Sequence, residues 1–279
     1  MTEEKVKHVL GLSGGKDSSA LAIYMRDNFP DLDIDYFFTD TGAELEEVHE
    51  YLLMLEGYLG KTILRLDPDR DFKHYMKQHN NFLPSPQARW CTVKLKLQPF
   101  ENWVQKEFIE NGYRVKSYVA IRADESFREG LVSKKDIETV LPFRDAHIDK
   151  QGVIEILENS GLGLPRYYDW RSRSGCTFCF FQRKIEWVGL LERYPEKFEE
   201  AKGMEKTALN DGSPFTWSSS ESLEQLQQPE RVAQIKADHA KKLEAAKKKK
   251  KINPLRPDEG FVDFDELYGQ QKVCLACHK

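Results

Sequence analysis

VKHVLGLSGGKDS, at residues 6–18, joins an apolar run to a glycine-rich turn and a helical pattern. The apolar run at residues 6–12 has the length of a buried strand, and residues 17–27 carry apolar side chains at helical spacing. Two adjacent glycines between them allow a tight turn. This stretch therefore predicts a strand–turn–helix unit, which is the usual first unit of an α/β fold.

Strand and helix patterns alternate over the first 66 residues, and a further helix and two further strands are expected between residues 100 and 143. A glycine, Gly112, closes the last of the expected helices, as glycine commonly does. Alternation of this kind is typical of a doubly wound, mainly parallel sheet. The expected strands are residues 6–12, 34–38, 62–66, 117–121 and 139–143, and the expected helices are residues 17–27, 44–57 and 100–111.

The pattern changes after residue 150, where strand-like runs give way to helices and polar loops. We expect one domain at residues 1–150 and a helical, cysteine-bearing extension at residues 151–279. A linker is expected at residues 253–260 because of its prolines. The helices expected in the extension are residues 153–159, 183–193, 196–204 and a long polar one, 222–251, which ends in five lysines.

Composition sets limits on the function of the 279 residues. Hydrophobic residues make up 40% and charged residues 32%, as in a soluble protein with a real core. The net charge of −4 means that any nucleic-acid contact must come from local basic patches. The apolar runs are too short to span a membrane, and the polar start MTEEK is unlike a signal peptide, so we expect a cytoplasmic protein.

The turn at residues 13–18 has the composition of a phosphate-binding loop. Its glycines, Gly14 and Gly15, let phosphate approach the backbone, and the helix that follows offers free N–H groups and a positive dipole end. The lysine supplies charge, the serines supply hydroxyl donors, and the aspartate can cap the helix or help to hold Mg²⁺. The loop matches neither GxxxxGK[ST] nor the three-glycine dinucleotide pattern. Its polar side chains are Ser13, Lys16, Asp17 and Ser18.

In this context the loop resembles that of the PP-loop ATP pyrophosphatases, which have the adenine nucleotide alpha hydrolase-like fold. These enzymes cleave ATP between its α and β phosphates to adenylylate a substrate. RWCTVKLKLQP at residues 89–99 and IRADESFR at residues 121–128 look similar to the PAPS-reductase-like branch. The resemblance covers residues 5–205, and it implies an α/β fold and ATP with Mg²⁺ at the loop.

The resemblance also implies roles for residues outside the loop. Thr39, Asp40 and Thr41 follow the second expected strand, at the end where open α/β sheets bind ligands, and would meet the adenosine. Arg122 and Arg128 would clamp phosphates or an adenylylated product, since guanidinium groups match phosphate oxygens. The alternative for both arginines is a surface ion pair. Lys16, Asp17 and Cys91 are the expected catalytic residues.

The five cysteines form a single residue and two CxxC pairs: Cys91, Cys176, Cys179, Cys274 and Cys277. An odd number in a cytoplasmic chain argues against a disulfide framework, and two CxxC pairs favour metal, cluster or sulfur chemistry. The first three are similar to the cysteines that hold a [4Fe–4S] cluster in adenylylsulfate reductases. Those enzymes have a cysteine pair where this chain has one cysteine, so Cys274, Cys277, another molecule or an open iron would complete the ligand set.

Two alternatives to the cluster stay open. The two CxxC pairs would make a four-thiolate zinc site, which leaves Cys91 as a persulfide carrier. The thiols could instead be free and reactive, with Cys274 and Cys277 as a resolving pair in a sulfur relay. Residues 274–278 also match the CxxCH pattern of haem attachment, which the cytoplasmic expectation disfavours.

The segment SGCTFCFFQRK, at residues 174–184, looks most similar to the sulfur-transfer component of bacterial DNA phosphorothioation systems, of the SspD and DndC type. This implies adenylylation of a DNA backbone phosphate, followed by sulfur insertion. The implied partners are DNA, a cysteine desulfurase as sulfur donor, other components of a modification complex and a second copy of the chain. The alternatives are a PAPS reductase, whose C-terminal Glu-Cys-Gly-Leu-His is absent here, a tRNA thiolation enzyme and a non-catalytic ATP-binding assembly partner.

Arginines and aromatic residues alternate around the first CxxC, at residues 166–184. Such a mixture would suit unstacked bases and phosphates of a nucleic acid. The alternative is a loop that packs its aromatic side chains inward and leaves its arginines in solvent.

Overall fold

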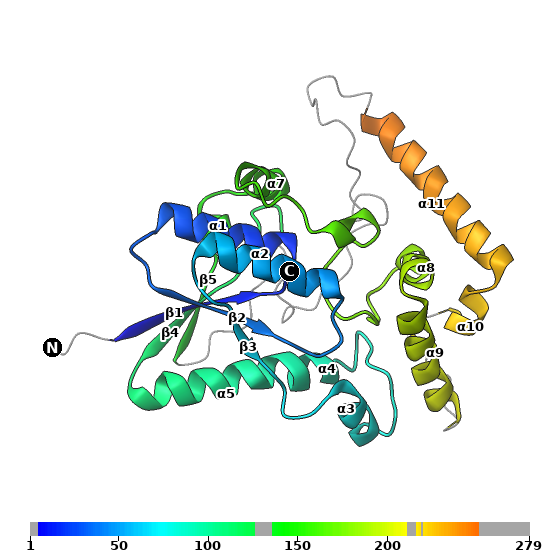
Figure 1. Cartoon of the computed structure of the whole chain (residues 1–279), viewed down its shortest axis with the longest axis horizontal. Coiled ribbons are helices and arrows are strands. Elements are labelled where there is room, and N and C mark those ends of the chain that lie inside the picture. The colour runs from blue at the N-terminus through cyan, green and yellow to red at the C-terminus, as the bar shows by residue number, and fades with distance from the viewer. Residues whose placement is uncertain (1–4, 126–135, 211–215, 219, 251–279) are drawn as a thin grey trace.

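A computed structural model describes residues 5–125, 136–210, 216–218 and 220–250. Its centre is a sheet of five strands in the order β3-β2-β1-β4-β5, with every neighbouring pair parallel (Figure 1). The predicted doubly wound α/β fold is confirmed. The strands are β1 Val6–Leu12, β2 Ile34–Thr39, β3 Leu64–Leu66, β4 Arg114–Tyr118 and β5 Ile137–Val140.

The strand order reverses beside β1. The chain moves outward from β1 through β2 to β3, and then returns to the other side of β1 for β4 and β5. Leu10 of β1 is therefore in register with Tyr36 of β2 and with Tyr118 of β4. Open α/β sheets bind ligands at such a switch point, beyond the carboxyl ends of the strands.

Helices cover both faces of the sheet, as a parallel sheet requires (Figure 1). One face carries α1 (Lys16–Asn28) and α2 (Glu46–Leu59), and α7 (Lys150–Asn159) packs on α1. The other face carries α5 (Gln98–Glu107). Side chains alternate between the faces along each strand, so Leu10 joins the large cluster under α1 and α2, whereas Val9 joins a smaller one under α5.

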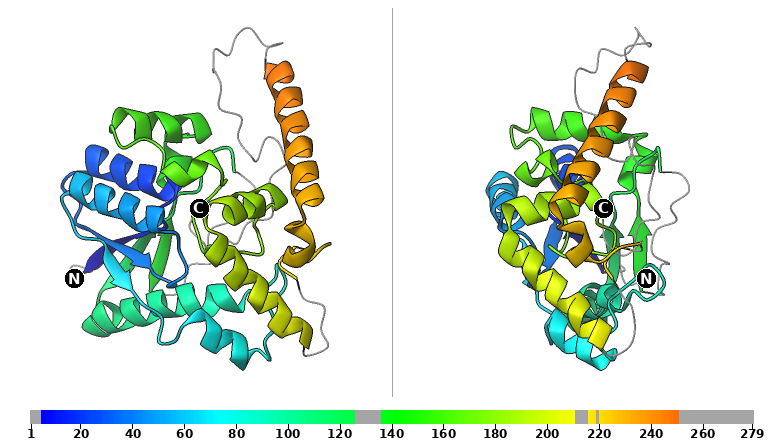
Figure 2. Two further views of the ribbon diagram at one scale, coloured as in Figure 1. Left: turned by 45° about the vertical axis from the view of Figure 1, so that its right-hand side comes forward. Right: turned by 90° about the vertical axis from the view of Figure 1, so that its right-hand side faces the viewer.

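Four helices follow in the C-terminal region and lie beyond the carboxyl ends of the strands (Figure 1). Figure 2 shows them as one group beside the sheet. They are α8 Lys184–Arg193, α9 Pro195–Asn210, α10 Leu223–Leu226 and α11 Pro229–Lys250. The single helix expected at residues 222–251 is wrong, because the chain ends α10 and starts a new helix at Pro229, which lacks an N–H and favours a first helical position.

Several boundaries differ from the expectations. The fourth strand begins and ends three residues earlier than predicted, because the chain turns after Tyr118, where the Ile121 N–H donates to the Val119 carbonyl at 3.0 Å. The short helix α3 (Phe72–Gln78) and a π-helical stretch at Val93–Leu97 had no clear sequence signal. Gly112 does close the helical segment after α5, with φ of 80°.

The large hydrophobic cluster takes residues from both sides of position 150. Leu52 of α2 belongs to it, and so do Tyr167 and Trp187, which are fully buried. The boundary at residue 150 stays a prediction. Within the part of the chain that the structure describes, no helix is both long and apolar enough to cross a membrane.

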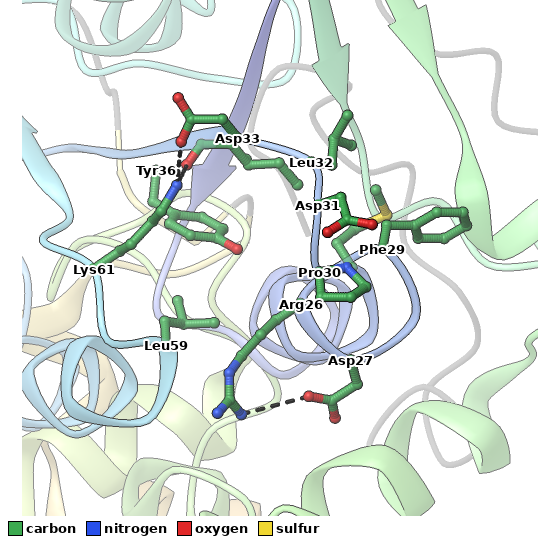
Figure 3. A pocket seen from close by; sticks show the side chains of 12 residues that line it. Arg26, Asp27, Phe29, Pro30, Asp31, Leu32, Asp33, Tyr36, Leu59 and Lys61 are labelled. Carbon is green, nitrogen blue, oxygen red and sulfur yellow. Dashed lines mark hydrogen bonds and ion pairs between the residues drawn. The ribbon is translucent and has the colours of Figure 1, made fainter.

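A cavity of about 690 Å³ opens at the amino end of β2 (Figure 3). Arg26 pairs with Asp27 and Lys61 pairs with Asp33 around it. It lies at the end of the strands opposite to the phosphate-type loop, which follows the carboxyl end of β1. Its position therefore argues against a share in the nucleotide site.

One buried carboxylate, that of Glu205, holds the backbone of Trp217 and Leu223. Glu205 accepts hydrogen bonds from the backbone N–H of Trp217 and of Leu223, each at 2.7 Å. We expect Glu205→Ala to lower the free energy of unfolding by about 2–4 kcal/mol, because it leaves two buried N–H groups without acceptors. Urea unfolding measures this loss. The exposed Glu196→Ala on the same helix is the control and costs under about 1 kcal/mol; equal losses would contradict the account.

Candidate functional site

Both glycines of the loop at residues 13–18 are required by its geometry. Gly14 has φ of +67°, and a Cβ there would lie 2.7 Å from Val48 Cγ1. Gly15 precedes α1 as its N-cap, and a Cβ there would lie 2.7 Å from Ser174 Oγ. Inside the loop, the Ser13 N–H donates to Ser18 Oγ at 3.2 Å. A hydrogen bond between Ser13 and Ser18 therefore closes the turn, and Val48 and Ser174 pack against its glycines.

The outside contact comes from residues Tyr167–Thr177, which we call the docking segment. The Tyr167 hydroxyl, fully buried, donates to the Gly14 carbonyl at 2.5 Å, and the Lys16 N–H donates to the Tyr168 hydroxyl at 3.1 Å. The Ser174 hydroxyl donates to Ser13 Oγ at 3.1 Å. The loop thus takes its shape from side chains about 150 positions away in the sequence.

The docking segment resolves one alternative left open by the sequence. Tyr167, Tyr168 and Trp170 are buried, so the aromatic residues pack inward. Arg171 and Arg173 are buried too, which neither reading anticipated. An open nucleic-acid surface on this segment is therefore wrong.

Three charged side chains meet at the switch point between β1 and β4. Lys16 Nζ lies 3.3 Å from one Asp17 carboxylate oxygen, and Arg122 Nη1 lies 2.9 Å from the other. All three are at most 6% exposed. Burial lowers the pKa of Arg122, but Asp17, Asp124 and Glu125 together outweigh this and raise it above the usual value, so the guanidinium stays charged.

Arg122 also donates through Nε to Asp124 at 2.9 Å. The alternative of a surface ion pair is half right, since the partner is Asp124 but the arginine is buried against the loop. Arg128 lies outside the described residues, as do Cys274 and Cys277, so their expected roles stay predictions.

The carboxyl end of β2 contributes a second group of polar residues. Asp40 Oδ1 accepts the Gly42 N–H at 2.8 Å, which closes the turn after Thr39. The Thr41 hydroxyl donates to Glu44 at 2.8 Å, and it lies 3.3 Å from Cys176 Sγ. Glu44, which sequence reasoning missed, is buried and also lies 3.9 Å from that sulfur.

The docking segment therefore reaches from the loop to the end of β2. Cys176 forms a β-bridge with Glu44, and the Thr177 N–H donates to the Ala43 carbonyl at 2.7 Å. Arg171, 1% exposed, donates to the Cys176 carbonyl at 2.7 Å. Among the described residues, no carboxylate lies within ion-pair distance of Arg171, so its charge is held by backbone carbonyls and Gln182.

Cys91, Cys176 and Cys179 gather near one another in the folded chain. Burial, together with the neighbouring thiolates of Cys176 and Cys179, raises the pKa of Cys91 to about 12. Burial likewise raises the pKa of Cys176 to about 12. The charge of Lys96 opposes both increases. Lys96 lies in the π-helical stretch at Val93–Leu97, and such irregular turns are frequent at functional sites. That irregularity is invisible in the sequence.

The cysteine thiols are the candidate ligands of a metal centre. Within the described ranges, no group of three or more cysteine, histidine, aspartate or glutamate side chains is close enough to hold a single ion. The zinc alternative needs Cys274 and Cys277, which lie outside these ranges. Three thiols in one neighbourhood fit a thiophilic centre in which each thiolate binds a different iron, as in a cluster.

Comparison with known proteins agrees with the loop and the sheet. Residues 7–134 match the family model of the phosphoadenosine phosphosulfate reductase domain. Residues 7–134 are therefore similar to that domain. The matched residues include β1, the loop at residues 13–18, Cys91 and Arg122, whereas the docking segment lies outside them.

The relatives by sequence are uncharacterized proteins. One from Methanocaldococcus jannaschii is 30% identical over 239 residues, which cover 75% of this chain and 46% of that protein. A second from the same archaeon is 23% identical and covers 67% and 45%. A 37.8 kDa protein of Escherichia phage 186 is 25% identical and covers 70% and 73%. The chain spans about half the length of its two archaeal relatives.

Solved structures show weaker likeness. A PAPS reductase from Candida auris, in complex with phosphate, gives a TM-score of 0.46 at 12% identity over 63% of this chain and 82% of that one. The U34-tRNA thiolase of Methanococcus maripaludis, with its [4Fe–4S] cluster, gives 0.42 at 16% identity over 73% of each chain. The NMN synthetase of Francisella tularensis gives 0.37 at 16% identity over 79% and 82%.

The contact between the loop and the docking segment can be tested by a double-mutant cycle. We expect Gly15→Ala to destabilise the protein by about 1–3 kcal/mol, because the new methyl group overlaps Ser174 Oγ. Ser174→Ala removes that oxygen and recovers part of the loss. Urea unfolding of the four proteins measures the coupling, expected at about 1 kcal/mol. Additive losses would show that the two residues are not in contact.

The buried thiols predict an unusual pH dependence of alkylation. Thiolate is the reacting form, so with a pKa of about 12 only about one Cys91 or Cys176 thiol in 10⁴ is ionised at pH 8. An ordinary cysteine, with a pKa near 8.5, is about one quarter ionised there. Iodoacetamide labelling of metal-free protein, followed by peptide mass spectrometry, should be slow at both sites and rise about tenfold per pH unit up to pH 11. A plateau near pH 9 would contradict the burial.

Proposed function

We propose that this protein is an ATP pyrophosphatase that adenylylates an acceptor oxygen, on a DNA backbone phosphate, so that sulfur can replace it. The carrying observation is the docking segment, which bonds to the phosphate-type loop at one end and holds Cys176 beside Thr41 at the other. A group that activates oxygen and a group that delivers sulfur must act at the same atom. One short segment that links both supports this pairing.

ATP would bind with its β and γ phosphates on the loop and the start of α1. The N-terminus of α1 offers N–H donors and a positive dipole end there. Lys16 and Arg122 are buried cations already pointed at Asp17, so the site has positive charge without the cost of ordering exposed side chains. Thr39, Asp40 and Thr41 lie at the carboxyl end of the neighbouring strand and would contact the adenosine.

The adenylylation step needs no redox partner. A non-bridging oxygen of the acceptor phosphodiester attacks the α-phosphorus of ATP, and the bond to the β-phosphate oxygen breaks to release pyrophosphate. Lys16 and Arg122 would stabilise the negative charge that develops on the phosphates. The acceptor oxygen then belongs to AMP, which is a good leaving group.

The sulfur step completes the exchange. A hydrosulfide attacks the activated acceptor phosphorus, and AMP leaves with the original oxygen. If the sulfur arrives as a persulfide on one cysteine, its outer sulfur attacks the phosphorus. A second cysteine thiol then attacks the inner sulfur, which breaks the S–S bond, releases the phosphorothioate and leaves a disulfide between the two cysteines. A cluster held by Cys91, Cys176 and Cys179 would supply an iron for holding sulfide. Glu44 and Arg171 position the Cys176 turn in either case.

Two variants separate the halves of this mechanism. Lys16→Ala should reduce pyrophosphate release from ATP on the order of 100-fold, because it removes a cation from the phosphate site. Cys176→Ser should leave pyrophosphate release within a few fold and abolish sulfur incorporation. A coupled pyrophosphate assay and mass spectrometry of digested DNA measure the two outputs.

The outcomes also discriminate the alternatives. Sulfur incorporation that survives both substitutions would identify an assembly partner instead of an enzyme. Sulfite release from a sulfonucleotide, with no pyrophosphate from ATP, would identify a reductase. Thiolated tRNA in place of phosphorothioate DNA would move the acceptor to RNA.

A further inference from the structure

A second cavity, of about 640 Å³, lies between the cysteine-bearing loops and the C-terminal helices. One wall is the loop Pro84–Gln87, and another is the stretch Phe180–Ile185 at the start of α8. Residues 216–218 and the first four turns of α11 complete it. A volume of this size accommodates a ligand of one or two nucleotide units, since small-molecule sites run from about 300 to 1,000 Å³.

The side chains that line this cavity are mostly positively charged, although the chain as a whole has a negative net charge. It holds four cations and a single carboxylate, Asp238, whereas the whole chain has a net charge of −4. A local excess of positive charge in a net acidic protein concentrates anions at that place. The four cations are Arg183, Lys184, Arg231 and Lys242.

The walls of the cavity are fixed in place. Arg231 donates to both oxygens of Glu221, at 2.7 and 2.8 Å, and Lys184 of α8 pairs with the same carboxylate. Glu205 holds Trp217 from behind through its backbone N–H. The cations on α8 and α11 are therefore ordered before any ligand arrives, which reduces the entropy lost on binding.

The cavity also adjoins the cysteines. Phe180, half-buried, lines it and directly follows Cys179, so their Cα atoms are about 3.8 Å apart. Gln87 lines the opposite wall four positions before Cys91. Phe180 offers an aromatic face next to the cations, which is the combination used to bind single-stranded nucleic acid.

We infer that this cavity binds the acceptor as a single nucleic-acid strand, with backbone phosphates on Lys242, Lys184 and Arg231 and a base beside Phe180. This inference rests on the proposed function for the identity of the acceptor, but not for the presence of the site. The strand would pass from α11 to the loop that carries Cys179, so that its phosphate reaches the sulfur-bearing cysteines. Of the nucleic-acid surface expected at residues 166–184, the part that lines this cavity is Phe180, Arg183 and Lys184.

The α11 helix offers a matched pair of variants. Lys242 lines the cavity, whereas the adjacent exposed Lys241 does not, so Lys242→Gln and Lys241→Gln remove the same charge at different places. We measure the affinity of full-length protein for a fluorescein-labelled 12-mer of single-stranded DNA by anisotropy, between 50 and 200 mM NaCl. We expect Lys242→Gln to weaken binding about fivefold and to reduce the salt slope by about 0.7, the loss of one phosphate contact. Lys241→Gln should stay within twofold of the unchanged protein.

The binding and pyrophosphate measurements test the cavity site and the proposed function separately. Equal losses in the two variants, or no loss in either, would overturn the cavity as the binding site, whether or not ATP is cleaved. Lys16→Ala should keep its oligonucleotide affinity while losing pyrophosphate release. A protein that releases no pyrophosphate but still binds DNA through Lys242 would overturn the proposed function and leave the cavity site standing. An RNA 12-mer that binds tenfold more tightly than DNA through Lys242 would support the cavity and move the acceptor to RNA.

Discussion

The structure depends on two tyrosine hydroxyl contacts to the phosphate-type loop. Tyr167 donates to the Gly14 carbonyl, and Tyr168 accepts from the Lys16 N–H, which leaves both backbone groups paired inside the protein. A glycine-rich turn has little conformational preference of its own, so an external partner must define its shape. Because those partners belong to the docking segment, the loop, the end of β2 and Cys176 are fixed relative to one another. The loop and Cys176 are therefore held by one continuous segment.

Charge burial is the second constraint on this unit. Lys16, Asp17 and Arg122 would be costly to bury singly, but both cations pair with Asp17, and Arg122 pairs with Asp124 as well. Arg122 follows β4 and the other two begin α1, so the pairing joins the two halves of the sheet across the switch point. An incoming triphosphate would compete with Asp17 for the same cations. The carboxylate of Asp17 thereby keeps both cations in place.

The elements that were predicted from the sequence have local sequence signals, whereas contacts between residues far apart in the chain could not be predicted. The first strand and SGGKDS specify each other within 18 residues, so β1, the turn and α1 were predicted almost to the residue. Glu44, Lys96 and Tyr168 carry no such signal, because their roles arise only when segments far apart in the chain meet. The burial of the arginines in the docking segment was not predicted for the same reason. A basic, aromatic stretch of sequence is equally compatible with an exposed binding surface and with a buried structural segment. The hydrogen bond from Arg171 to the Cys176 carbonyl identifies the buried arrangement.

The separation of 153 positions between Tyr167 and Gly14 has a consequence for synthesis of the protein. The strand and helix that flank the loop emerge from the ribosome early, but the hydroxyls that shape the loop are translated last among its parts. At about 5–20 residues per second, the loop waits roughly 8–30 seconds for its partners. During that time the growing chain has the glycine-rich turn but not the side chains that define its shape. The turn therefore takes its final conformation only after Tyr167 and Tyr168 have been made.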